Sequence, residues 1–138
     1  MKKRVYYISE ISLPSKSAYS IHVMKMCNEL SNFYGETTLI VFKKKKNKNF
    51  HQIYNCKNNF TILDMNINKN NFITRILYAL KLVNYLKKKK NTVIISRSII
   101  SALFLNFYKK EVILELHHTL RGFTKFLFYF LKRLKRFK

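Results

Sequence analysis

Residues 4–42 read RVYYISEISLPSKSAYSIHVMKMCNELSNFYGETTLIVF, and the order of elements in this stretch decides the fold. An apolar run at 4–9 is followed by a polar loop, a segment with helical spacing at 18–34, and a second apolar run at 37–42. A strand, a helix and another strand in this order are typical of a parallel β-α-β unit.

The same alternation continues along the rest of the chain. Further apolar runs predict strands at 60–65, 92–96 and 111–116, and helical spacing predicts helices at 72–90, 98–108 and 122–138. Most of the strand segments are continuously apolar, as in sheets that are buried on both faces. We therefore expect one domain over 1–138, an α/β fold with a Rossmann-like, mostly parallel sheet flanked by helices and the first strand central.

The helix at 18–34 is expected to begin after Ser17 as N-cap and to end at Gly35. In three of the expected helices, apolar residues recur at helical spacing, which predicts an apolar stripe that packs on the sheet. The stripes are Ile21, Val23, Met24, Cys27, Leu30 and Phe33; Ile73, Ile76, Leu77, Leu80, Val83 and Leu86; and Phe123, Phe126, Leu127, Phe130, Leu131 and Leu134. Residues 43–59 are polar, rich in Lys and Asn and poorly periodic, which predicts a mobile surface loop outside the core.

The chain is strongly basic, with 28 Lys and Arg against 6 Asp and Glu and a net charge of +22. Such a charge indicates a polyanionic neighbour such as nucleic acid, an anionic membrane or phosphorylated substrates. Lys outnumbers Arg by 22 to 6 and occurs in tracts with Asn, a pattern that an AT-rich coding bias would also produce. No signal peptide or membrane-spanning segment is expected, which predicts a cytoplasmic protein.

The loop after the first strand is a candidate ligand-binding segment, because loops at the carboxyl ends of parallel strands line the crevice in such folds. It contains Ser9, Pro14, Ser15 and Ser17 and leads into a helix N-terminus, where phosphate or carboxylate groups are favoured. His22 lies one turn into that helix. The loop has neither a G-x-G-x-x-G nor a Walker-type sequence, which argues against nicotinamide-cofactor or P-loop chemistry.

A second polar cluster, Glu115, His117 and His118, ends the fifth predicted strand. A histidine at this position can serve as a base or as a hydrogen-bond donor to a sugar hydroxyl, and it can equally be a structural residue. Arg97 follows the fourth strand, where it can hold an anionic group or form a surface ion pair. Neither the histidines nor Cys27 and Cys56 have metal-ligand spacing, so no metal is expected.

Several short motifs together resemble the family-four-like glycosyltransferases. At the start of the chain these are AYSIHV at 18–23, NEL at 28–30 and TLIV at 38–41. Later in the chain they are ISRS at 95–98 and VILELH at 112–117. The resemblance extends over nearly the whole chain with the motifs in the family's order.

The resemblance implies an enzyme of the GT-B type, in which two Rossmann-like domains face each other across a catalytic cleft. This chain would be the N-terminal, acceptor-side domain, without the C-terminal domain that binds the nucleotide sugar and carries an E-x₇-E motif. Hexosyl transfer to a lipid-linked or polysaccharide acceptor in cell-envelope synthesis is implied, with the nucleotide sugar as substrate and no cofactor. The stereochemistry of transfer stays open, and the missing half is expected on a separate chain if the enzyme is split.

The resemblance also implies roles for individual residues. His117 would be the catalytic residue that contacts the transferred sugar. Substrate binding would involve Ser9, Pro14, Ser15, Ser17, His22, Arg97, Glu115 and His118. Many family members have a glycine pair in the first loop, which this chain lacks.

The basic surface fits a peripheral position on the inner face of the cell membrane, where anionic lipids attract Lys-rich loops. Two other functions are compatible with the composition. One is a nucleic-acid-binding protein that uses lysines together with 9 Tyr and 12 Phe. Most aromatic residues fall on expected core faces and Arg is sparse, so no nucleic-acid partner is expected. The other is a non-catalytic membrane-surface adaptor anchored by its basic final helix.

Overall fold

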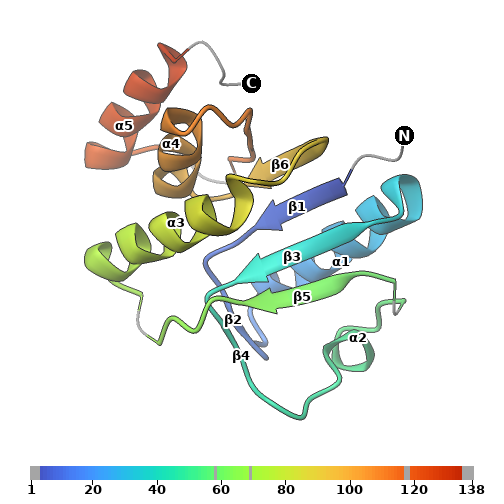
Figure 1. The fold of residues 1–138 in the computed structure, drawn as a ribbon. Helices are drawn as coiled ribbons and strands as arrows, with labels where there is room; N and C mark the ends of the chain where they lie inside the picture. Colours follow the sequence, from blue (N-terminus) through green and yellow to red (C-terminus); the bar gives the residue numbers. More distant parts are fainter. Residues whose placement is uncertain (1–3, 58, 69, 117–118, 135–138) are drawn as a thin grey trace.

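A five-stranded parallel sheet between two helical layers forms the centre of the computed structural model (Figure 1). The structure describes residues 4–57, 59–68, 70–116 and 119–134. In sheet order, the strands are β5 (Thr61–Asp64), β3 (Thr37–Val41), β1 (Arg4–Ile8), β6 (Thr92–Ser96) and β7 (Ile113–Leu114). Every pairing in this sheet is parallel. The predicted Rossmann-like α/β class and the central first strand are therefore confirmed.

The central strand β1 is buried on both faces. Tyr6 and Ile8 point into a core cluster beneath one helical layer, whereas Tyr7 points into a second cluster on the opposite face. Alternate side chains of a strand point to opposite sides, so a strand covered on both sides must be apolar at successive positions. This requirement explains the continuous run of apolar residues in β1.

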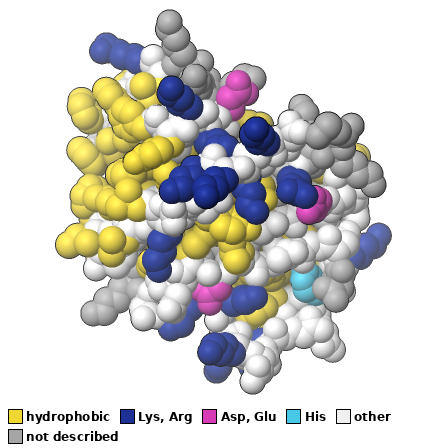
Figure 2. Space-filling model, viewed as in Figure 1, with side chains coloured by type: hydrophobic (Ala, Val, Ile, Leu, Met, Phe, Trp, Pro, Cys, Tyr) yellow, Lys and Arg dark blue, Asp and Glu magenta, His cyan; other side chains and the backbone are white. Residues whose placement is uncertain are grey.

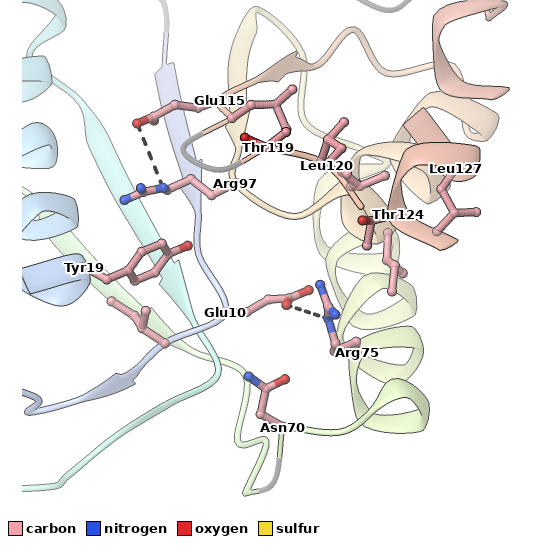
Figure 3. Close-up of a pocket in the computed structure, with 14 residues that line it drawn as sticks. Glu10, Tyr19, Asn70, Arg75, Arg97, Glu115, Thr119, Leu120, Thr124 and Leu127 are labelled. Atoms are coloured by element: carbon pink, nitrogen blue, oxygen red, sulfur yellow. Dashed lines mark ion pairs between the residues drawn. The ribbon is translucent and has the colours of Figure 1, made fainter. Parts of the chain in front are cut away.

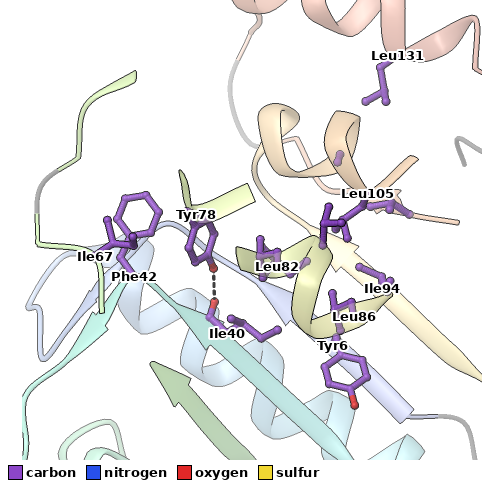
Figure 4. Packing of buried hydrophobic residues seen from close by; sticks show 14 residues of the cluster. Tyr6, Ile40, Phe42, Ile67, Tyr78, Leu82, Leu86, Ile94, Leu105 and Leu131 are labelled. Carbon is purple, nitrogen blue, oxygen red and sulfur yellow. Dashed lines mark hydrogen bonds between the residues drawn. The ribbon is translucent and has the colours of Figure 1, made fainter. Parts of the chain in front are cut away.

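The helices divide between the two faces of the sheet. α1 (Ala18–Tyr34) covers one face, while α3 (Phe72–Leu86) and α4 (Ile99–Phe107) cover the other, with α5 (Gly122–Lys132) against α4 (Figure 1). Figure 4 shows Tyr78, Leu82 and Leu86 of α3 in the core cluster on that second face. In the same cluster, the Tyr78 hydroxyl donates to the carbonyl oxygen of Ile40 over 2.9 Å.

Local capping interactions fix the ends of the helices. The Ser17 side chain accepts a hydrogen bond from the backbone N–H of Ser20, and Gly35 follows α1 with φ of 81°, as predicted. A reciprocal pair of hydrogen bonds between Asn71 and Thr74 begins α3. Ser98 caps α4 by accepting from the backbone N–H of Ser101.

The predicted apolar stripes are wrong at several positions. In α1, Ile21 is exposed and Phe33 is 84% exposed, although Val23, Met24 and Cys27 are buried as expected. In α3 the buried side chains include Tyr78, Ala79 and Leu82, and the exposed ones include Ile73, Leu77 and Leu80. In α5, Leu131 is buried while Phe123, Phe126 and Phe130 are exposed. Helices that are apolar around most of their circumference offer more than one possible stripe, and packing against neighbours selects one.

The prediction of a loop outside the core at 43–59 is also wrong. β4 (Lys43–Lys44) pairs in parallel with β2 (Ser12–Leu13), and a short helix, α2 (Phe50–Ile53), follows. The side chains of Phe50 and Tyr54 are buried in the cluster beneath α1. Burial of these two aromatic side chains, together with the pairing of β4, holds the segment on the domain. The polar residues around them make the two buried positions hard to recognise in the sequence.

Replacing Tyr54 with Phe tests how this segment is held. The Tyr54 hydroxyl accepts a hydrogen bond from the backbone N–H of Ser15 over 2.7 Å and donates one to the Ser15 carbonyl over 2.6 Å. Tyr54→Phe removes both bonds and should lower the free energy of unfolding by about 1–2 kcal/mol, measured by urea denaturation. Tyr34→Phe, at a half-exposed tyrosine of α1, serves as control. Equal urea midpoints for Tyr54→Phe and the unmodified protein would contradict the proposed anchoring.

Candidate functional site

A cavity lies where the carboxyl ends of three neighbouring strands meet (Figure 3). Glu10 follows β1, Arg97 follows β6, and Glu115 follows β7, and all three residues line the cavity, whose volume is 430 Å³. After β1, the chain adds β3 and β5 on one side of that strand. It then crosses to the other side of β1, where it adds β6 and β7. In open α/β sheets the carboxyl end of such a switch point is the usual ligand-binding position.

The Glu115 carboxylate connects three parts of the fold. The buried Tyr7 hydroxyl, in β1, donates a hydrogen bond to Oε2 of Glu115. Oε1 of Glu115 lies 3.5 Å from Nε2 of His22 and 3.9 Å from Nε of Arg97. The contact with His22 becomes an ion pair when the imidazole is protonated. The structure therefore brings together three of the residues predicted from sequence, His22, Arg97 and Glu115.

Arg97 is a buried cation with incomplete hydrogen bonding. Its side chain is 3% exposed, and its guanidinium carbon lies 4.0 Å from the centre of the Tyr19 ring. The 3.9 Å separation from Glu115 is too long for a hydrogen bond, and Nε and Nη1 have no hydrogen-bond partner among the described residues. A buried donor without an acceptor costs about 1–3 kcal/mol. Oxygen atoms of a ligand in the adjoining cavity would reduce this cost.

A second pair of charges stands across the cavity. Nε of Arg75, from α3, lies 2.7 Å from Oε2 of Glu10 (Figure 3). The Ser98 hydroxyl donates a hydrogen bond to the other oxygen of that carboxylate. Glu10, Arg75 and Tyr19 are not among the individual site residues predicted from the sequence. Glu10 could have been found, because it follows the first strand within the loop that was selected. No sequence pattern marks Arg75 as a site residue, because its position at the cavity depends on how α3 packs on the sheet.

The wall of the cavity combines apolar and hydrogen-bonding side chains. Ile99 and Leu127 line it beside Asn70, Thr119 and Thr124. Two carboxylates that accept hydrogen bonds and two guanidinium groups that donate them therefore face an apolar surface. Hydroxyl groups both donate and accept, so a polyhydroxylated ligand matches this combination.

The predicted serines of the first loop contact other parts of the fold and not the cavity. Ser9 is buried, with its hydroxyl 3.4 Å from that of Tyr19, and Ser17 caps α1. Ser15 is held by Tyr54, and Pro14 follows a cis peptide bond. None of the four lines the described cavity, so substrate binding by these residues stays a prediction.

His117 and His118 lie outside the described residues. The residues on either side of them, Leu116 and Thr119, both line the cavity. Among the described residues, no three His, Cys, Asp or Glu side chains are grouped so that they could hold a metal ion. None of the described helices is both long and apolar enough to cross a membrane.

Comparison with known proteins supports the fold assignment. No protein-family model matches the sequence, and no curated protein matches it. Among solved structures, the apo form of the lipopolysaccharide outer core galactosyltransferase WaaB is similar, with a TM-score of 0.53 over 91% of this chain and 16% sequence identity. The chain spans 37% of the length of that enzyme. The fold is therefore a Rossmann-like α/β domain of a kind found in a galactosyltransferase.

Alkaline pH should destabilise the protein. Burial raises the pKa of Tyr7, and the hydrogen bond to Glu115 raises it further, while burial alone is the main cause of the raised pKa of Cys27. In the unfolded chain the corresponding pKa values are about 10 and about 8.5. The folded chain therefore keeps protons that the unfolded chain loses, and stability that is fully present below pH 8 declines as the pH rises above these values.

The measurement is urea denaturation at about pH 8 and about pH 10.5 under reducing conditions. Tyr7→Phe should lessen the decline, by up to about 1.4 kcal/mol for each pH unit above 10, because it removes one group with a raised pKa. All other ionisable groups are common to both proteins and cancel in the comparison. An identical decline in the two proteins would show that Tyr7 does not contribute.

Proposed function

We propose that this chain is the acceptor-side domain of a two-domain glycosyltransferase of the GT-B type. In the proposed reaction, an acceptor hydroxyl forms a bond to the anomeric carbon of a nucleotide sugar as the bond from that carbon to the diphosphate breaks. The nucleoside diphosphate leaves with the electron pair of that bond, and the proton of the acceptor hydroxyl passes to a base or to water. The cavity among Glu10, Arg75, Arg97 and Glu115, placed at the switch point of a fold that a galactosyltransferase also has, carries the proposal.

The charges of the cavity favour a glycan over a nucleic acid. Each arginine stands beside a carboxylate, so the four charged groups nearly neutralise one another. A nucleic-acid phosphate chain would meet two negative charges here, whereas sugar hydroxyls find both donors and acceptors. We propose a lipid-linked or polysaccharide acceptor, whose sugar would occupy the cavity. The incomplete hydrogen bonding of Arg97 provides donors for a hydroxyl oxygen of the acceptor sugar.

The donor half of the reaction would lie elsewhere. We propose that a second domain, on the same or a separate chain, binds the nucleotide sugar and closes the cleft. His117, proposed from the resemblance as the catalytic residue, would then contact the transferred sugar at the boundary of the two halves. Positioning and electrostatic stabilisation supply much of the rate in enzymes, and both require the second wall of the cleft.

Binding to the cavity can be measured by calorimetry with a short-chain polyprenyl diphosphate sugar as soluble acceptor. Arg97→Met removes the charged donors with little change in length and should weaken binding by roughly tenfold or more. Arg4→Met is the matched control, because Arg4 lies at the opposite end of β1 and pairs with Glu36. Equal affinities for Arg97→Met and the unmodified chain, or binding of nucleic acid in the cavity, would refute the proposed site.

The 138-residue chain alone is expected to transfer no sugar. Turnover of radiolabelled nucleotide sugars should be measured with mixed lipid acceptors, first with this chain and then after adding a candidate donor-binding domain. Activity should depend on the added domain. Robust transfer by the chain alone would show that the two-domain proposal is wrong.

A further inference from the structure

Five phenylalanine side chains from three helices form one exposed apolar area, which we name the aromatic surface. Its members are Phe72 of α3, Phe107 of α4, and Phe123, Phe126 and Phe130 of α5, each between 43% and 65% exposed. The ring centres of Phe72 and Phe123 are 6.2 Å apart, as are those of Phe123 and Phe126, and those of Phe107 and Phe130 are 6.1 Å apart. Figure 2 shows a broad hydrophobic area on the side of the molecule that carries α5.

The charged residues on the three helices that carry the aromatic surface are all basic. Within their described bounds, α3, α4 and α5 contain no Asp or Glu. α5 carries Lys125 and Lys132, and Arg121 and Arg133 flank its two ends. Exposed apolar residues beside cations favour an anionic interface, because the apolar side chains insert while the cations stay among the anionic headgroups.

We propose that the aromatic surface docks on the interface of an anionic lipid bilayer. A second copy of this chain would bring the cations of both copies together, which is unfavourable. Phenylalanine has no hydrogen-bonding group and suits the acyl boundary of a lipid leaflet.

Docking through α5 also fits the position of the cavity. Thr124 and Leu127, on the same helix as the aromatic surface, line the cavity. A bilayer against the aromatic surface would bring the cavity close to the headgroups, where a lipid-linked acceptor presents its sugar. This last step rests on the proposed function, but membrane docking itself does not.

The test is co-sedimentation of the 138-residue chain with vesicles of phosphatidylcholine alone and with vesicles containing about one quarter phosphatidylglycerol. The chain should bind the anionic vesicles preferentially, and binding should weaken as salt shortens the screening length from about 10 Å at 0.1 M to about 3 Å at 1 M. The double variant Phe123→Ser and Phe126→Ser should reduce partitioning roughly tenfold or more. Phe33→Ser, on α1 across the sheet, is the matched control and should bind like the unmodified chain.

Circular dichroism establishes that both serine variants are folded before binding is compared. Equal binding to the two vesicle types, or unchanged binding of the folded double variant, would overturn the proposal. A concentration-dependent dimer that the double variant abolishes, without vesicle binding by the unmodified chain, would assign the surface to a second copy instead. Vesicle binding without glycan binding would leave docking intact and refute only the proposed function.

Discussion

The placement of β1 between two parallel neighbours is the constraint on which the rest of the structure depends. β1 pairs with β3 on one side and with β6 on the other, and helices cover both of its faces. Parallel neighbours require crossover connections. The crossover from β1 to β3 through α1 and the crossover from β5 to β6 through α3 run in opposite directions along the sheet, and their right-handedness therefore places the two helices on opposite faces. The same geometry separates the loops at the carboxyl ends of β1 and β6 and creates the cavity between them.

At this edge of the sheet, each carboxylate lies beside a basic side chain that offsets part of its charge. Tyr7 and His22 contact Glu115, and Glu10 is held by Ser98 and Arg75. Buried charges are expensive unless they are paired and hydrogen-bonded. Arg97 departs from that rule, since two of its nitrogen atoms lack hydrogen-bond partners among the described residues. Such an exception beside a cavity is more informative about ligand binding than a fully satisfied ion pair.

α5 connects the two proposals because it contributes to both surfaces. It lines the cavity with Thr124 and Leu127, and it carries three of the five phenylalanines of the aromatic surface. One side of α5 packs on the domain through the buried Leu131, while its phenylalanines remain exposed on another side. The net charge of +22 is the reason for proposing an anionic partner, because a strongly basic protein attracts anionic groups electrostatically.

The sequence by itself determined where the main elements lie and how the sheet is built. Continuous apolar runs identified the five strands, and local chemistry placed Ser17 and Gly35 at the ends of α1, because caps depend on residues adjacent in sequence. It also placed Arg97 and Glu115 at the correct edge, since both directly follow strands.

Only the tertiary structure decided which side of each helix is buried and which polar groups meet. The apolar residues of α3 allow several orientations, and packing on the sheet selected the one that buries Tyr78 and exposes Ile73. The hydrogen bond from Tyr7 to Glu115 joins residues 108 positions apart, and the ion pair of Arg75 with Glu10 depends on the orientation of α3. Periodicity and capping are local properties, whereas these contacts exist only after distant segments have packed together.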